Sequence, residues 1–184
     1  MNQAETHFFK MIAEQASEYA VPGDEIKELE RGCAFSEFQF LDHQPINVSL
    51  SNEGGIESPD FICRYRIPLV SDRFKNVLIT AGVDNLFYKA VILYADKIGI
   101  RKRYWLALPP RIRCLNREAS TFEEDDSGLM PEAVKIVINP SKVGNYKIFC
   151  LGEVINRDII VTYELKKEIE KAKLSGIYFE ALEE

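Results

Sequence analysis

Hydrophobic residues near the start of the chain recur at intervals of three and four positions. They are Ala4, Phe8, Ile12, Ala16 and Tyr19. Such spacing places apolar side chains on one face of a helix. The pattern therefore predicts a helix over residues 3–20, which Pro22-Gly23 ends. The charged stretch from Asp24 to Arg31 predicts one or two further helical turns.

Beyond residue 34 the spacing of the apolar residues changes from helical to alternating. Phe35, Phe38 and Phe40 predict a strand with one irregularity, and residues 46–50 predict a strand able to pair with it. Further strands are expected at residues 87–94, 104–108, 112–115, 134–138 and 147–151. Short strands separated by frequent Gly and Pro are typical of a mostly antiparallel sheet.

Residues 70–91 resemble residues 161–182 position by position without gaps. The aligned pairs include Val70 with Val161, Ser71 with Thr162, Phe74 with Leu165, Leu78 with Ile169, and Ala81 with Ala172. Each copy predicts a helix, a turn and a short strand. The hydroxyl residue can cap the helix, and Asn85 or Gly176 can take the left-handed conformation of the turn. Internal duplication and independent recurrence of a common unit both explain the agreement, and both predict that the units look alike.

These elements together predict an α+β fold. We expect a mostly antiparallel sheet with an N-terminal helix and two similar helix–turn–strand units, at residues 70–91 and 161–182. The chain has 184 residues and no linker rich in Gly, Ser or Pro, which favours a single domain over 1–184.

Composition and cysteine spacing narrow the class of protein. The net charge of −6 argues against a general nucleic-acid binder, which needs a surplus of positive charge. The four cysteines, Cys33, Cys63, Cys114 and Cys150, lie far apart and form no metal-binding or redox motif, so we expect buried free thiols in a reducing compartment. The N-terminus lacks the pattern of a signal peptide, and no apolar run is long enough to span a membrane. We therefore expect a cytoplasmic protein with no membrane partner.

The sequence carries no local motif for catalysis or for a cofactor. It has two histidines and no glycine-rich phosphate loop, so we expect neither a metal nor a cofactor and a non-enzymatic role. Two alternatives stay open. One is an enzyme whose site forms around His43 and Cys63 from distant parts of the chain. The other is a nucleic-acid-binding module that uses the basic stretch 101–117, in which Tyr104 and Trp105 are candidates for stacking on bases.

An acidic run follows this basic stretch. It consists of Glu123, Glu124, Asp125 and Asp126. The run lies between Thr121-Phe122 and Ser127-Gly128, which predicts an exposed loop, and it lacks the ligand spacing of a calcium-binding loop. We therefore regard these four residues as candidates for contact with a partner.

Several segments identify a family. They are residues 69–75 (LVSDRFK), 104–106 (YWL), 114–120 (CLNREAS), 157–166 (RDIIVTYELK) and 172–179 (AKLSGIYF). In type and order they resemble the bacterial immunity-protein family eleven, formerly domain of unknown function 1629, over residues 58–184. Residues 1–57 match less clearly, and Asn116 stands where the family pattern has an aspartate.

This resemblance implies a protein of a polymorphic-toxin system that binds one cognate toxin and neutralises it without catalysis. The acidic loop would then steer a basic toxin toward the protein, because complementary charge raises the association rate. The sequence carries no signal for an oligomeric state.

Overall fold

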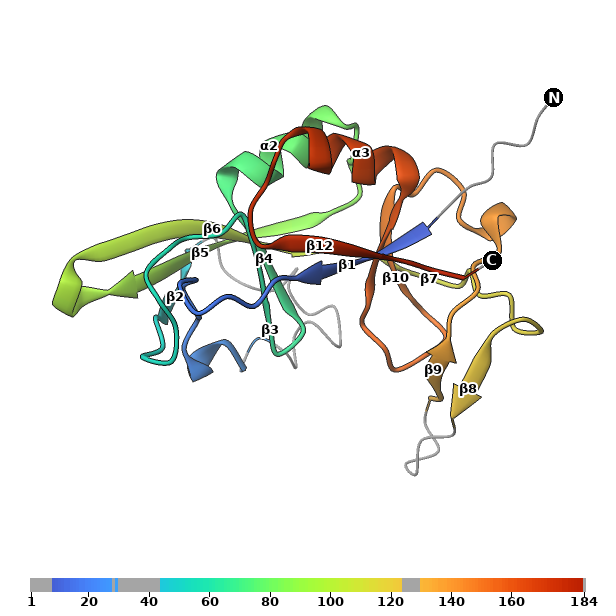
Figure 1. Ribbon diagram of the computed structural model, residues 1–184, viewed down its shortest axis with the longest axis horizontal. Helices are drawn as coiled ribbons and strands as arrows, with labels where there is room; N and C mark the ends of the chain where they lie inside the picture. Colours follow the sequence, from blue (N-terminus) through green and yellow to red (C-terminus); the bar gives the residue numbers. More distant parts are fainter. Residues whose placement is uncertain (1–7, 28, 30–43, 124–129, 184) are drawn as a thin grey trace.

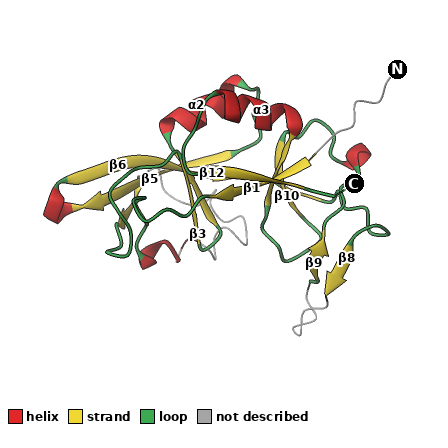
Figure 2. Ribbon diagram, viewed as in Figure 1, coloured by secondary structure: helices red, strands yellow, loops and turns green. Residues whose placement is uncertain are grey.

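The computed structural model describes residues 8–27, 29, 44–123 and 130–183, and within these residues the fold is mostly β (Figures 1 and 2). It has twelve strands and two α-helices, α2 (Asp72–Thr80) and α3 (Tyr163–Lys171). The strands are β1 (Phe8–Ala13), β2 (Ile46–Ser49), β3 (Phe61–Arg64), β4 (Ile67–Val70), β5 (Phe87–Ala95), β6 (Ile100–Leu108), β7 (Arg111–Ile112), β8 (Thr121–Glu123), β9 (Glu132–Lys135), β10 (Ile148–Leu151), β11 (Ile159–Thr162) and β12 (Ile177–Ala181). Short 3₁₀ turns are η1 (Asp24–Lys27), η3 (Asp96–Ile98) and η4 (Pro140–Lys142).

The strands form three sheets. Two have five strands each, in the orders β12-β1-β11-β10-β7 and β2-β5-β6-β4-β3, and the third is the hairpin β8-β9. All pairs are antiparallel except β2 with β5 and β7 with β10. Figure 1 shows α2 and α3 side by side along one side of the two larger sheets, and the hairpin of β5 and β6 projecting at one end of the molecule.

The N-terminal helix predicted over residues 3–20 is wrong. Residues 8–13 form strand β1, which pairs with both β11 and β12. Both faces of β1 are covered, since Phe8 packs in one core cluster while Phe9 and Met11 pack in another. A strand covered on both faces carries apolar residues at consecutive positions. Such a run contains apolar residues four positions apart, such as Phe8 and Ile12, and this spacing is also typical of a helix.

The predicted fold class changes accordingly, from α+β to mostly β. Among the described residues the predicted strands overlap β2, β5, β6, β9, β10 and β12, although β2 pairs in parallel with β5. The strand predicted at residues 112–115 shares only Ile112 with β7. The strand predicted around Phe35, Phe38 and Phe40 lies outside the described residues. The charged stretch after Gly23 begins with the predicted turn, η1.

The two repeated units share one strand order. The first consists of the hairpin β3-β4, helix α2 and strand β5, and β6 lies between β4 and β5. The second consists of the hairpin β10-β11, helix α3 and strand β12, and β1 lies between β11 and β12. The middle strand of the first unit follows β5 directly. In the second unit the middle strand comes from the other end of the chain.

The register of the strands is also the same in both units. Val70 and Ala90 both lie opposite Trp105, while their counterparts Val161 and Ala181 both lie opposite Phe9. The likeness therefore extends beyond the aligned segments, to the rest of the preceding hairpin and to the middle strand.

The two helices begin in the same way, but the turns that follow them differ from the predicted ones. The Ser71 hydroxyl accepts a hydrogen bond from Phe74 N–H at 3.0 Å, and the Thr162 hydroxyl accepts one from Leu165 N–H at 3.4 Å. After the helices, the left-handed residues are Gly82 and its counterpart Lys173, at φ of 76° and 51°. Gly176 is left-handed as predicted, whereas its counterpart Asn85 is not among the residues of positive φ.

One core cluster lies beneath both helices and joins the units. It takes Phe61, Val70, Phe74 and Leu78 from the first unit, and Ile148, Val161, Leu165 and Ile169 from the second. Polar contacts also cross between the units. Lys147 Nζ donates to Ala81 O at the end of α2 at 2.6 Å, and the Arg73 guanidinium donates to Ala172 O and Lys173 O at the end of α3. Each helix thus ends against a cation from the other unit, which favours its negative C-terminal dipole.

Candidate functional site

The acidic run predicted to contact a partner begins at the last residue of β8. Glu123 is exposed at the end of β8, and Glu124, Asp125 and Asp126 lie outside the described residues. The hairpin is held to the rest of the molecule by Asn156, whose side chain accepts from Ala133 N–H at 2.7 Å and donates to Ala133 O at 3.2 Å. The structure therefore places the start of the acidic run on an anchored projection.

The geometry at Cys63 does not favour the enzymatic alternative. His43 lies outside the described residues, so the structure does not bring the two side chains together. Cys63 is exposed along one wall of a groove but surrounded by protein on its other sides. Burial and the negative charge of Asp158 raise the pKa of the Cys63 thiol to about 11. Such a thiol stays protonated at neutral pH and is a poor nucleophile. Within the described residues no group of acidic, Cys or His side chains could hold a metal ion.

The aromatic residues of the basic stretch are engaged inside the protein. Tyr104 is buried, and its hydroxyl donates to Pro59 O at 2.7 Å. Trp105 Nε1 donates to Asp72 at 2.7 Å, and Lys75 Nζ lies 3.2 Å from the centre of the Trp105 ring. Rings held in this way are not free to stack on bases, so the geometry argues against the nucleic-acid alternative.

The basic residues of the same stretch are partly neutralised by neighbours. Arg103 forms an ion pair with Asp72 at 2.9 Å, and Arg101 forms one with Asp96 at 3.2 Å. Hydrogen bonds from Arg103 and Trp105 hold the pKa of Asp72 below its usual value. The Arg111 side chain donates to two backbone carbonyls, Leu151 O and Val154 O. The side chains of Lys102, Arg113 and Arg117 are exposed, so the geometry argues against the nucleic-acid alternative through the engaged rings and ion pairs and not through a lack of positive charge.

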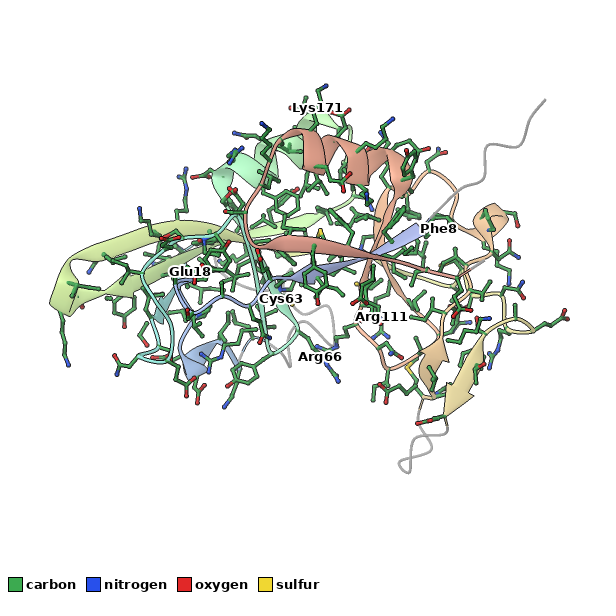
Figure 3. The ribbon with its side chains drawn as sticks, in the orientation of Figure 1. Phe8, Glu18, Cys63, Arg66, Arg111 and Lys171 are labelled. Carbon is green, nitrogen blue, oxygen red and sulfur yellow. The ribbon has the colours of Figure 1, made fainter. Side chains whose placement is uncertain are left out.

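A groove beside Cys63 is the surface that sequence reasoning missed. It encloses about 440 Å³ and is lined by residues 13–17, 19–22, 61–64, Glu53 and Pro59. Figure 3 shows Glu18 and Cys63 on neighbouring segments of this region. Burial, together with the negative charges of Glu14, Glu18 and Glu57, raises the pKa of Tyr19. The helix prediction placed Glu14 and Glu18 between the apolar positions of a helix, so it gave no sign that residues 13–17 and 19–22 line a groove.

The described surfaces thus resemble a surface for contact with another protein more than a catalytic site. The comparison with protein families decides what kind of protein this is. The model of the Immunity protein family (Imm11) matches residues 3–184. The chain belongs to the Imm11 immunity protein family. No curated protein matches the chain.

The Imm11 match covers more of the chain than the resemblance noted from the sequence. It begins at residue 3 and so includes residues 3–57, which the resemblance did not cover. The structure gives a reason, because β1, which lies in that part, is the middle strand of the second unit. Among the described residues of this Imm11 protein, no helix is long and apolar enough to cross a membrane.

Proposed function

We propose that this protein neutralises a cognate bacterial toxin of a polymorphic-toxin system by binding it in the cytoplasm, without catalysing a reaction. The observation that carries the proposal is the family match over residues 3–184. The shared core of the two units supports it, because a binding protein gains affinity when its contact surface is held in place before the partner arrives. Because the two units share this core, we also propose that residues 1–184 act as one domain.

The acidic run supplies a proposed means of attraction. Glu123, Glu124, Asp125 and Asp126 would raise the association rate of a basic toxin by their field, and salt would weaken this effect. Replacing all four with Ser or Asn should lower the association rate about tenfold at low salt and leave the dissociation rate nearly unchanged.

The test uses the protein encoded beside this chain. Bacteria that express this neighbour alone should stop growing, and co-expression of the chain should restore growth. The two purified proteins should co-elute from a sizing column. A chain that neither forms this complex nor restores growth would contradict the proposal. A control chain in which Phe74, Leu78 and Leu165 of the core are changed to Asp should not protect.

A further inference from the structure

Strand β12 ends its sheet with an open backbone edge. In the order β12-β1-β11-β10-β7 it pairs only with β1 along its five residues. Two hydrogen bonds fix which residues face β1. Leu182 N–H donates to Phe8 O, and Glu14 N–H donates to Gly176 O, both at 2.9 Å. Because antiparallel partners alternate, Ile177, Phe179 and Ala181 turn their N–H and C=O groups away from β1. Within the described residues no strand pairs with that side of β12 from Ile177 to Ala181; just beyond it, Glu183 forms an isolated parallel bridge with Val137.

The other described sheet edges are partly covered, short or guarded. The Ser49 carbonyl at the end of β2 accepts from Gly23 N–H, Phe61 N–H of β3 donates to the Ser175 carbonyl, and β7 and β8 have only two and three residues. The edge of β9 is occupied by the Asn156 side chain. The unpaired side of β6 near the hairpin tip carries the exposed charges of Arg101, Lys102 and Arg103, which discourage strand pairing.

Strand β12 is less protected between Ile177 and Ala181, where Glu180 is its one charged residue. It contains no Pro, Lys or Arg, and its sequence Ile-Tyr-Phe-Glu-Ala is typical of a pairing strand. Tyr178 is 45% exposed beside the open edge, where a large ring can anchor a partner. Figure 1 shows β12 at the front of its sheet with β1 behind it. The C-terminal end of β12 lies near β9, because Glu183 forms an ion pair with Lys135 at 2.6 Å.

We propose that β12 receives an extended strand of the toxin, which adds to the sheet beside Ile177, Phe179 and Ala181. This inference rests on the proposed function and names its contact surface. Backbone hydrogen bonds would supply affinity, and the side chains of alternate residues would supply specificity. Exposed Tyr178 and Glu180 select an apolar residue and a basic residue on the incoming strand. Glu123 ends β8, which pairs with β9, and β9 lies near the C-terminal end of β12, so the charge of Glu123 would help to bring such a strand near.

The test is Ala181→Pro, measured by titration calorimetry against the purified protein encoded beside this chain. The Ala181 side chain is exposed and its N–H faces away from β1, so proline removes the outward donor without breaking the β1 ladder. We expect the affinity to fall about tenfold or more, because a partner carbonyl is left unpaired. The matched control Ala181→Ser keeps the N–H and should bind like the wild type.

A second variant, Tyr178→Lys, places a positive charge on the same edge, which discourages strand pairing, and should also weaken binding.

The outcomes separate the two proposals. Wild-type chain that does not bind or protect overturns the proposed function and this inference with it. If the wild type binds and both folded variants, Ala181→Pro and Tyr178→Lys, bind equally well, the edge is not the contact surface, while the proposed function stands. The wild type could also be a dimer that Ala181→Pro converts to a monomer without changing the affinity for the toxin. This result would show that the edge joins two copies of this chain, and it would also overturn the inference. Urea unfolding of each variant establishes that it is folded.

Discussion

Gly176 is the residue with the narrowest steric tolerance in the second unit. Its φ is +77°, and an added Cβ would lie 2.6 Å from Pro59 Cβ and 2.7 Å from Phe61 O. Gly176→Ala should therefore lower the free energy of unfolding by about 3 kcal/mol, through both the left-handed backbone and the clash. Gly82→Ala is the matched control, since its φ is +76° and the nearest atom, Lys147 Nζ, is 3.4 Å away. It should cost about 1 kcal/mol in urea unfolding. Equal losses would show that the contact with the Pro59 segment is unimportant.

Asp60 joins three segments at the boundary between the units. Its carboxylate accepts from Ser71 Oγ at 2.6 Å, from Ser175 N–H at 2.9 Å and from Arg73 at 3.3 Å. The Asp60 side chain is 11% exposed, and asparagine in its place has one acceptor oxygen fewer, so at least one of these donors loses its partner. We expect Asp60→Asn to destabilise the fold by about 1–2 kcal/mol in urea unfolding.

The matched control for Asp60 is another Asp–Arg pair, on the surface. Asp96 and Arg101 are 67% and 70% exposed in their side chains. Asp96→Asn should change the free energy of unfolding by no more than about 0.5 kcal/mol. If the two asparagine variants were equally stable, the Asp60 bonds would add nothing beyond an exposed pair.

At the scale of elements, the helices end against cations from opposite units. Lys147→Met should remove the donor to Ala81 O and destabilise the protein by about 1 kcal/mol. Amide hydrogen exchange should then speed up in the last turn of α2 more than in α3. Arg73→Met should instead speed up amide exchange in the last turn of α3 more than in α2, because Arg73 donates to carbonyls at the end of α3. Faster exchange in the same helix for both variants would contradict this arrangement.

Elements held by local patterns could be predicted from the sequence, and those held by distant partners could not. Ser71 and Thr162 mark both helix starts, since a cap and its apolar face lie within a few residues. Strand β1 was mistaken for a helix because its identity depends on β11 and β12, nearly the whole chain away. The same limit applies to the candidate site. The acidic run is visible in the sequence, but whether the edge of β12 is open depends on the order of strands in the sheet.

At the scale of the whole molecule, the two units differ mainly in how their middle strands are connected. Ala90 and Trp105 face each other within the hairpin of β5 and β6, and Ala181 and Phe9 face each other with no hairpin between them. The core beneath the helices takes buried residues from both arrangements, Met11 from β1 and Ala107 from β6. Packing and register are therefore independent of whether the middle strand follows the helix in sequence.

A circular permutant tests this independence. Joining residue 184 to residue 1 by a short flexible linker, and opening the chain between Ile98 and Gly99, would exchange the connections of the two units. The new ends fall at the exposed tip of the β5-β6 hairpin, where a Cβ on Gly99 would meet nothing within 4 Å. We expect this permutant to unfold in one cooperative step, with its free energy of unfolding lowered by about 1–3 kcal/mol through the changed loop closures.

A control opened between Val77 and Leu78 interrupts α2 beside the buried Leu78 and should not fold. If the hairpin-opened chain were as unstructured as this control by circular dichroism, the covalent link between β5 and β6 would be essential, and the equivalence of the two units would be limited to their final geometry.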